Sequence, residues 1–257
     1  MLHPAKGRVT PASARAAARD AKRSLRRMAR PAGRFDASRY FRGEHTLGFY
    51  NVGTGPMRAL AKAVHASHKE DWTVADAMTF ADLLIVDRHL EVKSVGIEVV
   101  ARYRRDFTPR LLPRWKRWLA RNHSANWATT DAICGSLLGP LLARHPALIP
   151  QMRAWSRSRN MWVRRASMVS LIRPIHEGLA LDLAYDNARR LHADDHDLIQ
   201  KAVGWVLREA GKMNATRLER YLRAHGPWIP RTTLRYAIER FPAARRRTLL
   251  MVTRHGR

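Results

Sequence analysis

Apolar residues recur at intervals of three and four positions from about residue 36 to the end of the chain. This spacing places them on one side of a helix, and the strict alternation that marks a half-buried strand is missing from the sequence. Prolines interrupt the pattern at many points, among them Pro109, Pro140 and Pro227, and a proline favours a helix boundary. The pattern therefore predicts an all-α fold.

Several of the predicted helices resemble one another. Residues 92–100, 163–171 and 199–207 superimpose as an apolar residue, two polar residues, a small residue and a further apolar residue. The second and third copies start 36 residues apart and the first and second 71 apart, so a further copy is expected at Trp127 to Leu138. Helix pairs at this spacing are typical of an α-solenoid of HEAT-like repeats that share one core.

The charge of the chain suggests what such a solenoid would bind. The sequence holds 48 Lys and Arg against 21 Asp and Glu, a net charge of +27, which exceeds what solubility requires and indicates an anionic polymer as partner. A membrane surface is the weaker alternative. Arg165 and Lys201 are each third in their copies, so we expect them to be neighbours on a concave basic groove.

Length and composition argue against other classes of protein, such as membrane, disulfide-bonded and zinc-cluster proteins. With 257 residues and 46% hydrophobic content, the chain is long enough to bury a core as one elongated domain or two small ones. No stretch approaches the roughly 20 uninterrupted apolar residues of a transmembrane helix, and no signal peptide begins the chain, so we expect a cytoplasmic protein with no membrane partner. The single cysteine, Cys134, excludes an internal disulfide and a thiolate zinc cluster.

Residues 1–35 differ from the rest of the chain. They hold ten Lys or Arg and one acid, Asp20, and are rich in Ala and Ser. This composition predicts a mobile basic N-terminal arm, with an arm that follows DNA and a transit peptide as alternatives. The HEAT-like repeat domain is then expected to span residues 36–257.

Two tryptophans stand beside charges at helical spacing. Trp127 and Asp131 are four residues apart, as are Lys201 and Trp205, with Arg208 three residues later, so each group shares one side of a helix. Asp131 lies among apolar neighbours and is expected to face a groove; the alternative is a buried structural ion pair, for example with Arg165. A core position is the alternative for Trp205.

Two aromatic faces and a carboxylate beside a basic surface suit the excision of a cationic base. Cleavage of an N-glycosidic bond passes through an oxocarbenium-like sugar, whose charge a carboxylate stabilises while it positions the attacking water. A base made cationic by alkylation leaves readily and needs no strong general acid. Tryptophan faces attract such cations.

At these residues the chain resembles the AlkD family of bacterial DNA alkylation repair glycosylases, HEAT-like proteins that remove alkylated purines. The resemblance runs from about Tyr40 to about Arg240 and is most specific in three motifs: Trp127-x-x-x-Asp131, Trp162-Val-Arg-Arg165 and Gln200-Lys-Ala-Val-Gly-Trp205-Val-Leu-Arg-Glu209. It implies a glycosylase that excises 3-methyladenine and 7-methylguanine from duplex DNA without flipping the base, as a monomer and with no cofactor. Asp197 and Leu198 replace aromatics found in some members, which leaves the lesion range open.

The resemblance also implies roles for individual residues. Trp127 matches one aromatic plate, Asp131 the catalytic aspartate and Trp205 the second plate. Arg165 matches the arginine that contacts the DNA backbone at the lesion, and Tyr40 resembles the tyrosine of the N-terminal helical segment. Further DNA contacts are expected from Arg58, Arg164, Lys201 and Arg208.

Other classes of function fit the sequence less well. The pair His192 and His196, with two aspartates between them, has the spacing of metal ligands, but such pairs are common at the start of solvated helices, and we expect no metal. A non-enzymatic binder of bent, branched or damaged DNA on the same scaffold is the main alternative. A protein-binding scaffold would not need the charge of +27.

Overall fold

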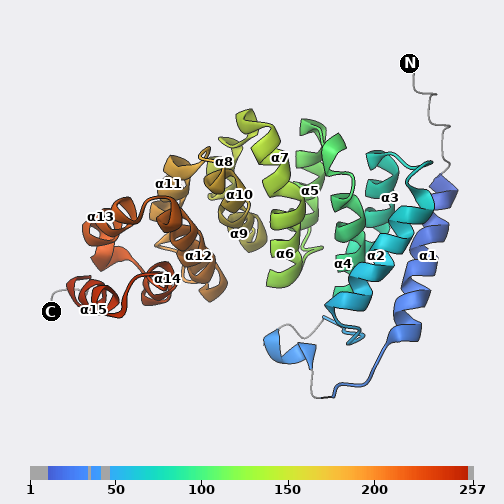
Figure 1. Ribbon diagram of the computed structural model, residues 1–257, viewed down its shortest axis with the longest axis horizontal. Coiled ribbons are helices and arrows are strands. Elements are labelled where there is room, and N and C mark those ends of the chain that lie inside the picture. The colour runs from blue at the N-terminus through green and yellow to red at the C-terminus, as the bar shows by residue number, and fades with distance from the viewer. Residues whose placement is uncertain (1–10, 34–35, 42–46, 254–257) are drawn as a thin grey trace. The chain divides into compact units, whose positions relative to one another are not determined.

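The computed structural model describes residues 11–33, 36–41 and 47–253. Within these ranges the regular structure is helical, which confirms the predicted all-α class (Figure 1). The one β-type pairing in the same ranges is an isolated parallel bridge between Gly48 and His89. The chain divides into two compact units, Met1–Leu137 and Leu138–Arg257, here called the N-terminal and the C-terminal unit.

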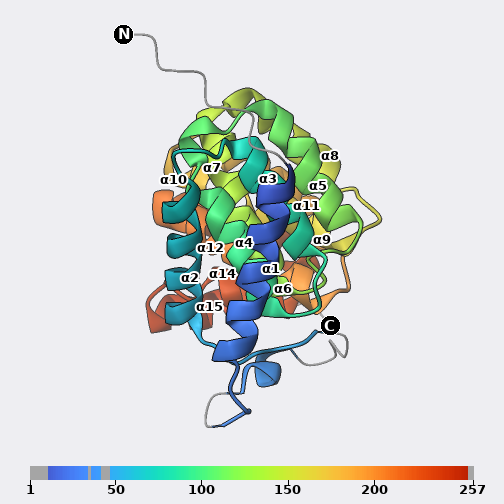
Figure 2. The ribbon, with the colours of Figure 1, turned by 90° about the vertical axis from the view of Figure 1, so that its right-hand side faces the viewer.

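The N-terminal unit is built around helices α3 and α4. Its elements are α1 (Pro11–Met28), η1 (Ala37–Tyr40), α2 (Thr54–His68), α3 (Val74–Ile85), α4 (Leu90–Ala101), η2 (Arg104–Asp106), η3 (Pro109–Leu111), α5 (Leu112–Ala120) and α6 (Trp127–Ile133), which continues into the π-helical segment η4 (Cys134–Leu138). Helices α1, α2 and α3 all pack on α4 (Figure 2). The side chains of Trp72, Phe80 and Trp115 are fully buried in this unit.

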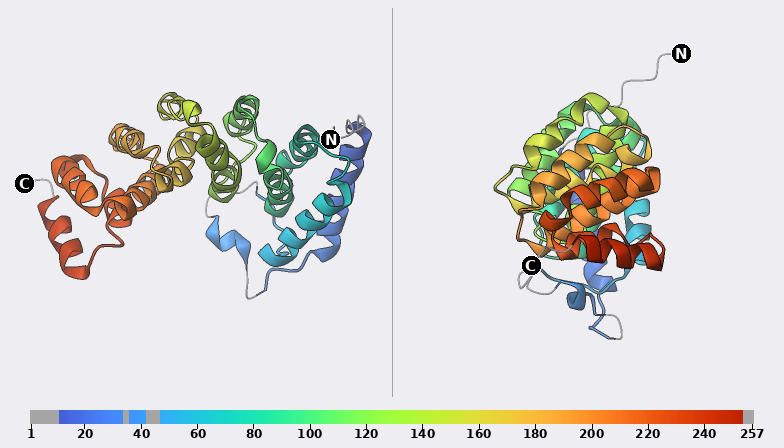
Figure 3. Two further views of the ribbon diagram at one scale, coloured as in Figure 1. Left: turned by 45° about the horizontal axis from the view of Figure 1, so that its top comes forward. Right: turned by 90° about the vertical axis from the view of Figure 1, so that its left-hand side faces the viewer.

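The C-terminal unit is organised around its longest helix, α12. Its elements are α7 (Gly139–Arg144), η5 (Pro146–Leu148), α8 (Gln151–Trp155), α9 (Met161–Val169), α10 (Ile172–His176), α11 (Leu181–Leu191), α12 (Asp197–Met213), α13 (Ala215–His225), η6 (Gly226–Trp228), α14 (Arg231–Ala237) and α15 (Ala243–Val252). Helix α12 packs against α9, α10, α11, α13 and α14, and α15 lies against α13 (Figure 3).

Residues 11–28 differ from the expected mobile arm. They form helix α1, in which Ala14, Ala17, Ala21 and Leu25 recur at helical spacing and are buried against α3 and α4. Small alanine side chains let the two backbones approach, and they form an apolar face that composition alone conceals behind the many arginines. The remainder of the predicted arm is described only at residues 29–33, because residues 1–10 and 34–35 lie outside the described residues.

The predicted sequence copies all fall on helices. Residues 92–100 lie in α4, 163–171 start in α9 and 199–207 lie in α12, while the copy expected near 127 begins α6. The first residue of each of the three aligned copies, Val92, Val163 and Ile199, is fully buried, as a shared core position requires. A continuous solenoid with a concave groove stays a prediction.

No single helix among the described residues is long and apolar enough to cross a membrane. One bent pair, Trp127–Arg144 with Pro146–Trp155, has the length and composition of a span.

Candidate functional site

The start of helix α6 is set by a tight turn and a side-chain cap. Asn122 and Ala125 adopt left-handed backbone conformations, with φ of 58° and 52°. The buried Asn126 then accepts a hydrogen bond from the backbone N–H of Thr129 at 2.7 Å, which satisfies a donor at the start of the helix. Trp127 is therefore the first residue of α6.

The indole of Trp127 is held by two uncharged contacts. Its ring is stacked on Phe41, with ring centroids 5.2 Å apart and planes 14° apart. Its Nε1–H donates to the backbone carbonyl of Tyr40 at 3.1 Å. Tyr40 itself is 64% exposed. The structure thus joins two of the predicted site residues, and it adds Phe41, which the sequence analysis missed although it directly follows Tyr40.

Asp131 lies one helical turn after Trp127 on the same side of α6. It is partly exposed, whereas Ile133 and Cys134, two and three residues later, are fully buried. The helix then loosens into the π-helical segment Cys134–Leu138, a conformation that often accompanies functional sites. The N-terminal unit therefore presents Tyr40, Trp127 and Asp131 along one part of its surface.

Arg165 in the C-terminal unit is buried and anchored. It is 5% exposed, and its Nη1 donates to the carbonyl of Leu198 in the first turn of α12. Lys201 follows within one turn, and the nearby Arg165 acts to lower the pKa of its ammonium. The two residues are neighbours, as the repeat offset predicted. The strongest influence on the Lys201 pKa is nevertheless the hydrogen bond to Asp197 at 2.6 Å, so the pKa is raised overall.

Arg164, next to Arg165 on α9, links two loops. Its Nε bonds to the carboxylate of Asp194 at 2.6 Å, and its Nη1 donates to the carbonyls of Ser158 and Arg159 at 3.0 and 2.9 Å. The predicted DNA contact is therefore engaged within the protein. Gln200 holds the same loop from the other side, because its Nε2 donates to the backbone carbonyl of Asp194 at 3.1 Å.

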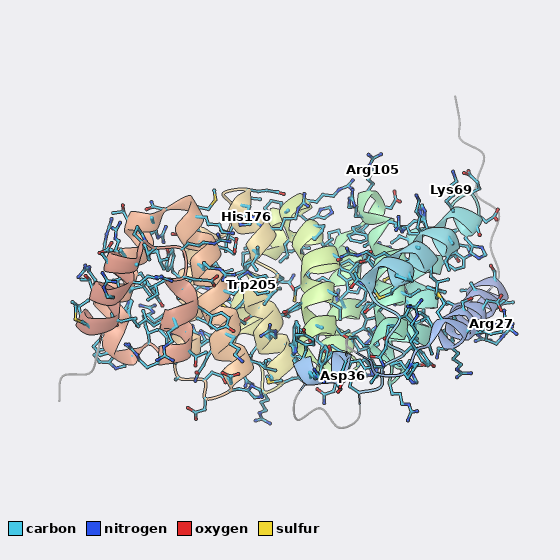
Figure 4. All side chains as sticks on the ribbon, turned by 60° about the horizontal axis from the view of Figure 1, so that its bottom comes forward. Arg27, Asp36, Lys69, Arg105, His176 and Trp205 are labelled. Carbon is cyan, nitrogen blue, oxygen red and sulfur yellow. The ribbon has the colours of Figure 1, made fainter. Side chains whose placement is uncertain are left out.

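Trp205 lies one turn after Lys201 on α12 and is partly exposed (Figure 4). Arg208, on the far side of the indole along the helix, forms ion pairs with Glu239, in the turn after α14, and with Glu209. The sequence predicted an indole between two cations, and the structure shows that a carboxylate accompanies each cation.

Glu209 is a buried carboxylate at the centre of a charge network beside these residues. It is 5% exposed and bonds to His176 at 3.0 Å and to Lys212 at 2.5 Å. Burial by itself would raise the pKa of Glu209, but the hydrogen bonds from Lys212 and His176 outweigh burial and the pKa is lowered. The carboxylate therefore stays charged and fixes this part of α12.

Gly204 explains how closely α14 approaches α12. A Cβ at this position would lie 2.5 Å from Cβ of Tyr236 and 2.6 Å from the carbonyl oxygen of Thr233. The hydroxyl of Thr233 in turn donates to the carbonyl of Gln200 at 2.9 Å. This contact places Tyr236, which is 37% exposed, beside the face that carries Lys201. Tyr236 is a second aromatic residue that the sequence analysis missed.

The remaining candidates have separate surroundings. Arg58 on α2 is exposed, and its Nε lies 3.4 Å from Glu98. His192 is buried and bonds through Nε2 to the hydroxyl of Tyr221 at 2.7 Å, while His196 accepts a hydrogen bond from the backbone of Leu198 through Nδ1. Across the described ranges, no three His, Cys, Asp or Glu residues gather as a metal site.

The sequence and the fold both resemble those of known proteins. A family model described as DNA alkylation repair enzyme matches residues 21–241. Among solved structures, a predicted DNA alkylation repair enzyme from Enterococcus faecalis shares the fold with a TM-score of 0.67; at 20% sequence identity, the match covers 80% of this chain and 93% of that one. No curated protein matched the sequence.

Proposed function

Because the chain belongs to the DNA alkylation repair enzyme family, we propose that it is a DNA glycosylase that removes alkylated, positively charged purines such as 3-methyladenine and 7-methylguanine from duplex DNA. The observation that carries this proposal is the placement of Trp127 and Asp131 on one side of α6, with the indole braced by Phe41 and by the Tyr40 carbonyl.

Asp131 supplies the charge that the reaction needs. As the bond from the sugar C1′ to the purine nitrogen breaks, the base takes the electron pair and leaves uncharged, and positive charge develops on the sugar. A carboxylate beside C1′ stabilises that charge more than it stabilises the ground state, so it lowers the barrier. Water then adds to C1′ and gives its proton to the carboxylate or to solvent. These steps require no metal and no cofactor.

The two tryptophans select the lesion in this proposal. The face of an indole attracts a cation by about 0.5–2 kcal/mol, depending on how far the contact is desolvated. An alkylated purine carries its charge while it is still stacked, so recognition through Trp127 and Trp205 does not require the base to leave the duplex. The fixed Trp127 ring suits this role, because its orientation is set before DNA binds.

The cations bind the phosphate backbone in this proposal. The sequence pattern shared by α4, α9 and α12 supports a HEAT-type solenoid whose concave face receives the duplex. Asp197 and Glu239, the partners of Lys201 and Arg208, have side chains 59% and 53% exposed, so solvent already competes for both pairs and a phosphate can replace the carboxylates. Arg165, which is buried, acts by holding the first turn of α12 in place.

Comparing Asp131→Asn with the wild type tests the proposal. The wild type is expected to release methylated purines from methylated duplex DNA, and Asp131→Asn to bind the same DNA while excising at least tenfold more slowly, because the change removes charge and keeps the shape. Asp71→Asn, an exposed aspartate of the same unit, is the matched control. Tight binding of the duplex without any release by the wild type would favour the non-enzymatic binder instead.

A further inference from the structure

A pocket of about 330 Å³ opens on the C-terminal unit where the loop after α8 meets the end of α11. Its lining includes Ser156, Arg157, Arg164, Arg190 and Asp194. Three arginines thus converge on it: Arg157 from the loop before α9, Arg164 from α9 and Arg190 from the end of α11. Its volume falls at the lower end of the range of small-ligand sites.

The walls of this pocket are fixed by Arg164. The Arg164 side chain is 21% exposed; it ties the carboxylate of Asp194, 11% exposed, to the carbonyls of the loop at Ser158. Asn160 stabilises the same loop by capping α9 through its side chain, at 2.9 Å from the backbone nitrogen of Trp162. The two sides of the pocket are therefore held together before any ligand arrives.

The charge of the pocket is positive. Arg164 neutralises Asp194, the carboxylate in the lining, and this leaves the guanidinium groups of Arg157 and Arg190. Both residues are exposed, and in the described part of the chain neither forms an ion pair with a carboxylate. Two guanidinium groups beside one concave surface match the shape and charge of a phosphate group.

We propose that this pocket binds one phosphate of the DNA backbone and so fixes the register of the duplex on the C-terminal unit. This inference rests on the proposed function for the identity of the polymer, and its chemistry is the recognition of phosphate oxygens by Arg157 and Arg190. The link to the candidate site is direct: the Asp194 loop that lines the pocket is held by Gln200, the residue before Lys201. A phosphate seated here positions the strand relative to α12.

A neutral-phosphate scan tests this proposal. A set of duplexes carries a single methylphosphonate, moved one nucleotide at a time along each strand, and binding is measured for the wild type, for Arg157→Ala/Arg190→Ala and for the control Arg220→Ala, an exposed arginine on α13. We expect one position at which the neutral linkage weakens binding to the wild type and the control and leaves the double variant unaffected. The salt dependence of binding should flatten by about one unit in the double variant alone.

Further variants and measurements distinguish the possible outcomes. Arg157→Lys/Arg190→Lys keeps the charges and should restore most of the salt dependence, and the folding of all variants is checked by circular dichroism. If the double variant responds to every methylphosphonate as the wild type does, the pocket binds no backbone phosphate. If inorganic phosphate raises the melting temperature of the wild type and not of the double variant, while the scan is unchanged, the ligand is a free phosphate and the proposal is overturned. Both readouts are binding measurements, so they remain informative if excision is absent.

Discussion

The two units support their candidate tryptophans in different ways. Trp127 in the N-terminal unit is braced by an aromatic ring and a backbone carbonyl, both uncharged. Trp205 in the C-terminal unit stands between Lys201 and Arg208, each of which is paired with a carboxylate. In the proposed function, the first arrangement fixes a ring beside the catalytic carboxylate, and the second holds cations that exchange a protein partner for a phosphate. Two similar sequence patterns thus lead to different physical environments.

The units also differ in the groups that make them sensitive to acid. In the N-terminal unit, Asp87 is held as a charged carboxylate by Lys22 at 2.9 Å and by His89. In the C-terminal unit, burial keeps His192 neutral and lowers its pKa to about 4. Acid therefore weakens each unit through a different group and in a different range of pH.

The largest expected effect concerns His192. Its pKa falls from 6.5 to about 4 on folding. Between these two pH values the His192 side chain therefore binds a proton in the unfolded chain but not in the folded protein. Stability is therefore lost as the pH falls from about 6.5 to about 4, by about 3 kcal/mol. His192→Gln can keep a hydrogen bond to Tyr221 and should remove this loss, as measured by urea unfolding at a series of pH values. An unchanged pH dependence in the variant would show that His192 does not cause this loss of stability.

The second largest expected effect is the loss of stability when Gly204, compared with Gly96, is replaced by alanine. A methyl group at Gly204 would meet the backbone of α14, with 2.6 Å to the Thr233 carbonyl oxygen, so we expect Gly204→Ala to destabilise the protein by about 1–3 kcal/mol. At Gly96 in the N-terminal unit the nearest atoms lie at 3.2 and 3.3 Å, and the cost of alanine should be smaller. Thermal unfolding of both variants measures the difference, and equal costs would show that α14 can move away from α12.

The charged carboxylate of Asp87 is expected to stabilise the folded protein by about 2 kcal/mol at neutral pH. Burial would raise its pKa, but the hydrogen bonds from Lys22 and His89 lower it from 3.8 to about 2. The stabilisation is present above pH 4 and is lost as the pH falls through about 2. Asp87→Asn should lose it at neutral pH, which weakens the attachment of α1 to the unit. Unfolding of the variant at pH 7 and pH 2.5 checks this, and the difference from the wild type should shrink at the lower pH.

The smallest effect tests the bracing of Trp127. Phe41→Leu removes the ring stacked on the indole and keeps an apolar side chain, so excision should slow by a few-fold, about 1 kcal/mol in the barrier, the scale of one aromatic pair. Phe107→Leu, which changes a buried aromatic of the same unit whose ring contacts Trp115, is the control. Equal losses in both variants would mean that general stability, not the orientation of Trp127, sets the rate.

Periodicity and spacing predicted part of this picture. The interval of three and four gave the all-α class, the 36-residue offset gave the neighbourhood of Arg165 and Lys201, and four-residue spacing gave the shared face of Trp127 and Asp131. These features depend on helix geometry, which repeats along a single element. The packed helix α1 was missed because arginine content dominated its composition, although its alanines have the spacing of a buried face.

The sequence by itself determined the helical class, the family motifs and the excess of positive charge. Only the tertiary structure decided which cations are already paired, as Arg164 is with Asp194, and which of them, such as Arg157 and Arg190, face a pocket. It also decided that Phe41, far from Trp127 along the chain, supports its indole. The reason is physical: periodicity records which side of a helix a residue occupies, whereas ion pairs, ring stacking and burial depend on contacts between elements that the local pattern does not encode.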